Sequence, residues 1–99
     1  MIAFNDSIRH VNTKHRSILR AIYPRPTPAT IRFDSLEKLV VALGGEVLEG
    51  AGSRVGFALN GVTAVFHRPH PGREAKRYAV REFSEFLASS GITEKGLGQ

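Results

Sequence analysis

The sequence predicts an α+β fold, a two-layer sandwich in which helices cover one face of a three-stranded antiparallel sheet. Two patterns support this fold class. Apolar residues recur at helical spacing on both sides of the middle of the chain, and three short runs between residues 46 and 67 alternate in polarity. A third signal is Asn60-Gly61, which joins two of these runs and is typical of a tight hairpin. We expect the 99 residues to form a single domain, 1–99.

An additional N-terminal helix is expected at residues 7–22, and Thr13 is the better cap if this helix starts late. Its apolar stripe consists of Ile8, Val11, Ile18 and Ile22. Three prolines in the connector, 23–32, end the helix and favour a stiff, extended segment. Both parts are additions to the expected core at 33–93, and they either cover a sheet edge or widen a partner interface.

The core begins and ends with a helix. For the first, Asp34 is the expected N-cap, Glu37 completes a capping-box pair, and Gly44-Gly45 is the stop signal. Its apolar face consists of Leu36, Leu39, Val40 and Leu43. The last helix is expected from Tyr78 to Ser90, followed by Gly91 and a frayed tail, 94–99. Its buried stripe consists of Val80, Phe83, Phe86 and Leu87.

Three strands are expected between these helices, at 46–49, 54–59 and 62–67. A two-residue turn at Asn60-Gly61 makes the numbers of opposed residues in the hairpin sum to 121. This register puts apolar pairs on one face: Leu59 with Val62, Phe57 with Ala64, and Val55 with Phe66. On the other face it places Arg54 directly opposite His67.

Charge and composition narrow the class of protein. The net charge is +5, and positive charge lies at the two ends: residues 1–32 carry +5, residues 33–66 carry −2 and residues 67–99 carry +2. Such a chain attracts polyanions. The absence of cysteine excludes disulfide scaffolds and cysteine catalysis. With no apolar run near the roughly 20 residues that span a bilayer and no leader, we expect a soluble protein without a membrane partner.

The most unusual segment is 67–77, which combines His67 and His70 with four basic residues: Arg68, Arg73, Lys76 and Arg77. Prolines at 69 and 71 are expected to hold it extended. Imidazoles exchange protons near neutrality, so two of them beside cations suit metal-free cleavage of an RNA phosphodiester. Two weaker interpretations are a basic RNA-contact loop without chemistry and a metal site, for which His67 and His70 lack a third ligand. We therefore expect no metal or other cofactor.

Several motifs in order resemble HicA toxins, which are paired with HicB antitoxins in bacteria. They are Phe33-Asp34-Ser35-Leu36-Glu37-Lys38-Leu39, Leu43-Gly44-Gly45-Glu46, Glu49-Gly50-Ala51-Gly52-Ser53-Arg54-Val55, Phe66-His67-Arg68-Pro69-His70-Pro71-Gly72 and Phe86-Leu87-Ala88-Ser89-Ser90-Gly91-Ile92. The resemblance covers roughly residues 13–93 and looks like a longer variant of the family. It implies a double-stranded-RNA-binding-like αβββα fold and a cytoplasmic, ribosome-independent mRNA interferase that a HicB-like antitoxin inhibits.

One position departs from the common form of the family, in which the glycine-serine pair precedes a catalytic histidine. Here Arg54 follows Gly52-Ser53, and arginine stays protonated at neutral pH. Because the register sets His67 opposite Arg54, our hypothesis is that His67 acts as base or acid with His70 as its partner or as a positioning group. The expected RNA contacts are Ser53, Arg54, Arg68, Arg73, Lys76 and Arg77. A non-catalytic relative that binds RNA or antitoxin, and a DNA-binding module, are the alternatives.

Overall fold

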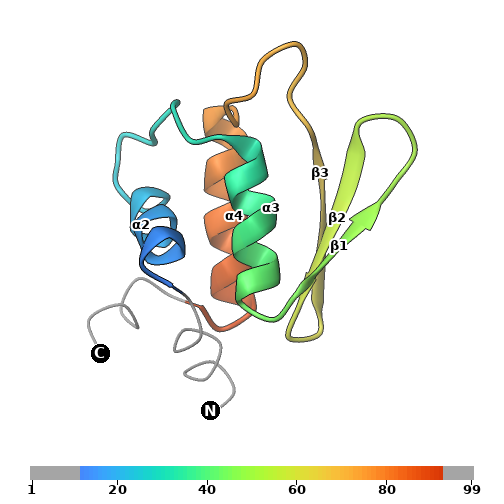
Figure 1. Ribbon diagram of the computed structural model, residues 1–99, viewed down its shortest axis with the longest axis horizontal. Coiled ribbons are helices and arrows are strands. Elements are labelled where there is room, and N and C mark those ends of the chain that lie inside the picture. The colour runs from blue at the N-terminus through green and yellow to red at the C-terminus, as the bar shows by residue number, and fades with distance from the viewer. Residues whose placement is uncertain (1–11, 93–99) are drawn as a thin grey trace.

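The computed structural model describes residues 12–92, which form a sheet, a pair of helices against it and one further helix (Figure 1). The sheet consists of β1 (Glu46–Glu49), β2 (Arg54–Leu59) and β3 (Val62–His67). Helices α3 (Phe33–Ala42) and α4 (Arg77–Ser89) cover one of its faces. This arrangement confirms the predicted α+β, αβββα fold.

The sheet is antiparallel, with the strand order β1-β2-β3. All three strands have the predicted bounds, and the register confirms the pairing of Arg54 with His67. Asn60 and Gly61 have φ values of 52° and 83°, as a type I′ turn requires. The Asn60 side chain also donates a 2.8 Å hydrogen bond to the carbonyl of Ser90, which ties the hairpin to the end of α4.

The core is centred on Phe57 of β2, which is fully buried. Its ring centroid lies 5.0 Å from that of Phe66 and 5.6 Å from that of Phe83, and Phe33 and Phe86 follow at 6.0 and 6.2 Å. These rings come from both helices and two strands, so one aromatic cluster fixes the distance between sheet and helices. The predicted stripe of α4 is buried in full.

Helix α3 begins two residues earlier than an N-cap at Asp34 predicts. Its N-cap is Arg32, without a side-chain capping bond, so the prediction of an Asp34–Glu37 capping box is wrong. The reason is tertiary: Ile31 and Phe33 pair with the segment before α4, through Phe33 N to Arg73 O at 2.9 Å and Ala75 N to Ile31 O at 2.7 Å. This bridge holds the chain extended up to Phe33, and α3 turns from there.

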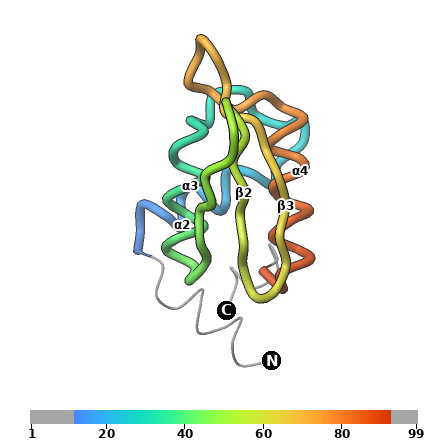
Figure 2. Tube along the Cα trace, turned by 90° about the vertical axis from the view of Figure 1, so that its right-hand side faces the viewer, coloured from blue at the N-terminus to red at the C-terminus, as the bar shows by residue number. Residues whose placement is uncertain are grey.

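The additional helix, α2 (Thr13–Ala21), packs against α3 on the side away from the sheet (Figures 1 and 2). It therefore does not cover a sheet edge. Its N-cap is Asn12 and not Thr13, because the Asn12 carboxamide accepts the 2.8 Å hydrogen bond of the His15 amide. The part of the expected helix at 7–11 lies outside the described residues, as does the expected tail at 94–99.

The connector between α2 and α3 is not extended throughout, contrary to prediction. It bends over residues 23–26, where the Arg25 guanidinium donates to the carbonyls of Tyr23 and Pro24 at 2.9 and 3.1 Å. Only its last residues run extended, in the bridge to the segment before α4. No helix in the described range has the length and apolar character needed to cross a membrane.

Candidate active site

A pocket of about 220 Å³ opens where β3 ends and α4 begins, and it holds both candidate histidines. We name it the histidine pocket. It is lined by Phe33, Ser53, His67, Arg68, Pro69, His70, Lys76, Tyr78 and Ala79. Segments far apart in the sequence thus meet here: the start of α3, the β1–β2 turn, the end of β3 and the start of α4. The structure brings together five of the eight predicted site residues.

His67 is held by the hairpin, whereas His70 belongs to the loop beyond it. The backbone N–H of Arg68 donates to Ser53 O at 2.9 Å, and the Ser53 hydroxyl lies 3.4 Å from His67 Nδ1, a long polar contact. The loop itself is not extended, contrary to prediction, because the chain bends at His70 and Pro71. Both imidazoles are exposed, so a substrate can reach them from solvent.

Arg68 occupies the centre of an ion-pair cluster. Its Nε donates to Glu37 Oε2 at 2.6 Å, and its two terminal nitrogens donate to the two oxygens of Glu49 at 2.8 and 2.9 Å. The hydrogen bonds that Arg68 donates to Glu49 and then to Glu37 raise the pKa of Arg68, and the bonds from Arg68 lower the pKa of Glu49. Arg68 thus joins the end of β3 to α3 and β1, and its guanidinium is already engaged by carboxylates.

The remaining basic residues of the predicted site lie around the histidine pocket in different ways. Arg54 faces His67 across the hairpin, but it does not line the pocket. Arg73 lines the neighbouring pocket. The Arg77 Nε donates to Thr27 O at 3.0 Å, so this side chain also anchors the connector. Of the predicted lysine and arginine contacts, only Arg68 and Lys76 line the histidine pocket itself, and Lys76 makes no ion pair with a described residue.

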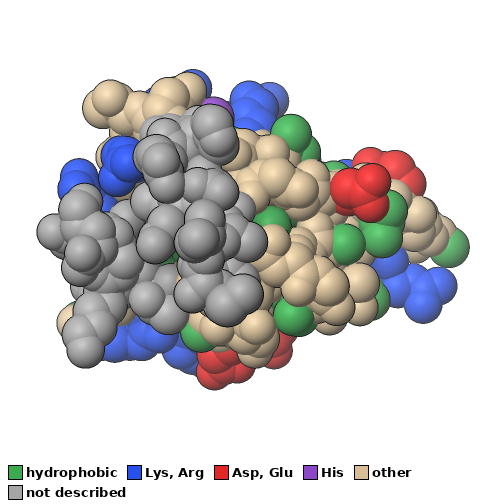
Figure 3. All heavy atoms as spheres, turned by 90° about the horizontal axis from the view of Figure 1, so that it is seen from below, with side chains coloured by type: hydrophobic (Ala, Val, Ile, Leu, Met, Phe, Trp, Pro, Cys, Tyr) green, Lys and Arg blue, Asp and Glu red, His purple; other side chains and the backbone are tan. Residues whose placement is uncertain are grey.

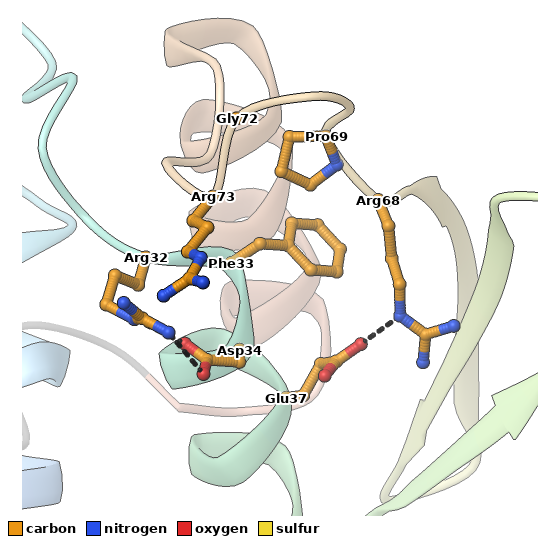
Figure 4. A pocket seen from close by; sticks show the side chains of 8 residues that line it. All are labelled: Arg32, Phe33, Asp34, Glu37, Arg68, Pro69, Gly72 and Arg73. Atoms are coloured by element: carbon orange, nitrogen blue, oxygen red, sulfur yellow. Dashed lines mark hydrogen bonds and ion pairs between the residues drawn. The ribbon is translucent and has the colours of Figure 1, made fainter.

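The neighbouring pocket, which we name the bridging pocket, has a volume of about 240 Å³ (Figure 4). It is lined by Arg32, Phe33, Asp34, Glu37, Arg68, Pro69, Gly72 and Arg73. Arg32 binds both oxygens of Asp34 at 3.1 Å, which lowers the pKa of that carboxyl. In Figure 4 the guanidinium groups of Arg32 and Arg73 lie on one side of the Phe33 ring and that of Arg68 on the other.

Two features of the site were not found from the sequence. Tyr78, which the sequence analysis identified only as the start of the last helix, lines the histidine pocket and is 49% exposed. Glu37 and Glu49, which hold Arg68, were interpreted as a capping residue and a strand residue. The signal for Tyr78 was an aromatic residue on the polar side of a helix start, whereas the partners of Arg68 depend on tertiary packing.

The opposite end of the molecule has a different character. In Figure 3, which shows this end, basic side chains are scattered around the rim of the visible face, and acidic groups lie among them. Within residues 12–92, no three histidine or carboxylate side chains are grouped so as to hold a metal ion. The histidine pocket brings two imidazoles, His67 and His70, to one space with two cations, Arg68 and Lys76.

The fold defines a structural class, and a match to a family model defines the protein family. Helix, three antiparallel strands and helix, with both helices on one face, are the double-stranded-RNA-binding-like arrangement. Residues 33–92 match the family model described as "HicA toxin of bacterial toxin-antitoxin". The chain belongs to the HicA toxin family, and helix α2 lies outside the matched range. No curated protein and no solved structure matches the chain.

Proposed function

We propose that the protein is a metal-independent endoribonuclease that cleaves mRNA in the cytoplasm and that a HicB-like antitoxin neutralises. Family membership supports the role of toxin in a toxin–antitoxin pair. The observation that carries the nuclease activity is the histidine pocket, in which His67, His70 and the ammonium of Lys76 surround one space. A small basic protein with such a pocket has what a phosphodiester substrate requires: proton transfer and cations for the developing charge.

The reaction needs no group beyond the RNA and the two imidazoles. One imidazole takes the proton of the ribose 2′-hydroxyl, and the 2′-oxygen forms a bond to phosphorus. The bond from phosphorus to the 5′-oxygen of the next nucleotide breaks, and the second imidazole, as imidazolium, gives its proton to that oxygen. The products are a 2′,3′-cyclic phosphate and a 5′-hydroxyl, so atoms and charge balance.

The other residues assist in distinct ways. Lys76 holds the charge on the phosphate oxygens, and Arg54, Arg73 and Arg77 flank the pocket as contacts to the RNA backbone. The exposed ring of Tyr78 offers a face on which a base next to the scissile phosphate stacks. Ser53 orients His67 through the 3.4 Å contact with Nδ1. Arg68 is a positioning residue, because its donors face Glu37 and Glu49.

The alternative is a non-catalytic family member that binds RNA or antitoxin. It is favoured by one observation, Arg54 in the position after Gly52-Ser53 where the resemblance leads us to expect histidine. The two candidate functions differ in whether the imidazoles at the end of β3 and in the following loop catalyse proton transfer.

Expression of the wild type and of the His67→Ala and His70→Ala variants separates them. Wild type is expected to arrest growth with loss of messenger RNA and to leave cyclic-phosphate ends on purified RNA. Each variant is expected to lose about a hundredfold in cleavage rate, the usual effect of removing a general acid or base. Both side chains are exposed, so neither substitution is expected to change the stability of the fold. The fold control is therefore urea unfolding, in which each variant should have the wild-type midpoint. A wild type that binds RNA without cleaving it, or a fully active His67→Ala variant, contradicts the proposal.

A further inference from the structure

The histidine and bridging pockets continue into a third, which α2 completes. This helix pocket has a volume of about 260 Å³ and lies between α2 and the start of α3. The bridging pocket shares Phe33, Arg68 and Pro69 with the histidine pocket. It shares Arg32 and Asp34 with the helix pocket. Consecutive pockets with common walls form one surface track that passes the N-terminal end of α3.

We propose that the helix pocket binds a backbone phosphate of the same RNA strand that the histidine pocket cleaves. This inference rests on the proposed function, and it gives the additional helix a role in substrate binding. The ligand class is a phosphodiester, outside the scissile position and recognised by charge. Base identity plays no part in this subsite.

Charge pairing along the track supports a polyanion as the ligand. Each carboxylate in the track walls already faces an arginine: Glu37 faces Arg68, and Asp34 faces Arg32 at 3.1 Å. Four further cations line the track: Lys76 in the histidine pocket, Arg73 in the bridging pocket, and Lys14 with Lys38 in the helix pocket, where Lys38 also helps to lower the pKa of Asp34. Among the described residues none of these four makes an ion pair. The track therefore offers positive charge at intervals along its length.

The helix pocket is formed by the packing of α2 against α3, and its two lysine side chains are exposed to solvent. Leu19 and the following Ile22 are fully buried and fix α2 against the core. Lys14 and Ile18 are four residues apart and share the face of α2 that lines the pocket. Lys38 projects from α3 on the other side. Lys14 and Lys38, on two different helices, thus line one cavity, an arrangement suited to one phosphate.

The test is binding of a single-stranded oligoribonucleotide of about 16 nucleotides, the upper end of the site sizes known for OB-fold modules that bind single strands. The protein carries His67→Ala and His70→Ala, so the RNA stays intact. Adding Lys14→Gln and Lys38→Gln is expected to weaken binding roughly tenfold and to flatten the slope of log K against log salt by about 1.4. Arg20→Gln is the matched control, since Arg20 is exposed on the same helix but outside the helix pocket.

A second measurement uses the active protein and a dinucleotide substrate, which fills only the histidine pocket. Lys14→Gln/Lys38→Gln is expected to cleave the dinucleotide at the wild-type rate while losing efficiency on the long RNA. If the double lysine variant binds long RNA as tightly as the Arg20→Gln control, the proposed subsite is wrong. Cleavage of RNA by the wild type would still support the nuclease function in that case. If wild type neither cleaves nor binds RNA, the proposed function fails and the subsite fails with it.

Discussion

Replacing Arg68 by glutamine removes the group that joins three elements at the edge of the histidine pocket. Arg68 lies between His67 and the loop that carries His70, and it contacts Glu37 of α3 and Glu49 of β1. The substitution keeps a polar side chain of similar reach but removes the charge and the forked geometry of the guanidinium. We expect a loss of both stability and catalytic rate.

The magnitude of the stability loss follows from burial. The side chains of Arg68 and Glu37 are 33% and 20% exposed, between a surface ion pair and a buried one. Exposed pairs contribute up to about 1 kcal/mol, and breaking a buried pair costs about 3 to 5 kcal/mol, so we expect roughly 2 kcal/mol for Arg68→Gln. The Glu49 side chain is 70% exposed, and its part of this loss is the smaller one.

Urea unfolding of the single and double variants measures these contributions. With a slope of about 1.5 kcal/mol per molar urea, Arg68→Gln is expected to shift the midpoint by roughly 1.3 M. A double-mutant cycle with Glu37→Gln should give a coupling energy of about 1 to 2 kcal/mol, and a cycle with Glu49→Gln a smaller one.

Kinetics separate positioning from RNA contact. A positioning residue affects kcat, and a displacement of about 1 Å in the site is enough for a roughly hundredfold loss. We therefore expect kcat to fall while KM for RNA and its salt dependence stay unchanged, with partial rescue in Arg68→Lys. A raised KM, a flatter salt slope and an unchanged kcat would show that Arg68 contacts RNA directly, and this result would refute the reasoning.

Three further predictions concern the fold. Phe57→Ala should lower the free energy of unfolding by about 4 kcal/mol in urea titration, because the ring is fully buried among four others; a loss below about 2 kcal/mol would contradict its central place. Gly45→Ala should cost about 2 kcal/mol, because its Cβ would collide with a β2 carbonyl and lie 2.8 Å from a valine methyl of α3. Gly56→Ala is the control and should change the midpoint little, since its Cβ would meet the nearest atom at 3.5 Å; equal losses in both variants would rule out the clash. Arg68 lowers the pKa of Glu49, so the native state binds fewer protons than the unfolded chain there, and stability should fall as the pH drops below about 4.3. Glu49→Gln should lack that part of the acid slope in unfolding measured from neutral to low pH; an unchanged slope would contradict the pairing.

Local patterns were sufficient for the sheet. The alternation of side chains and the Asn60-Gly61 turn predicted every strand bound, because both depend on residues close in sequence. The same turn predicted Arg54 opposite His67, which is a direct consequence of register. Helix α4 was expected at 78–90 and lies at Arg77–Ser89, since its apolar stripe fixes the buried face but not the terminal residues.

Side-chain partners were less predictable. Glu37 has the spacing of a capping residue, yet it binds Arg68, which is 31 residues away in the chain. Asp34 is a residue type that commonly caps helices. The bridge between Ile31–Phe33 and Arg73–Ala75 moves the helix start, however, and Asp34 pairs with Arg32 instead. In both cases a distant segment competes with a local interaction that the pattern indicates.

The sequence by itself determined the order of elements, the hairpin register and the presence of two histidines in a basic segment, because each is encoded in neighbouring residues. Only the tertiary structure decided that His67 and His70 border one pocket with Lys76 and Tyr78, and that α2 adds Lys14 to the same track. The physical reason is that loops and the packing of helices against one another bring these groups together. Contacts of that kind depend on the shape of the whole core, which no short stretch of residues specifies.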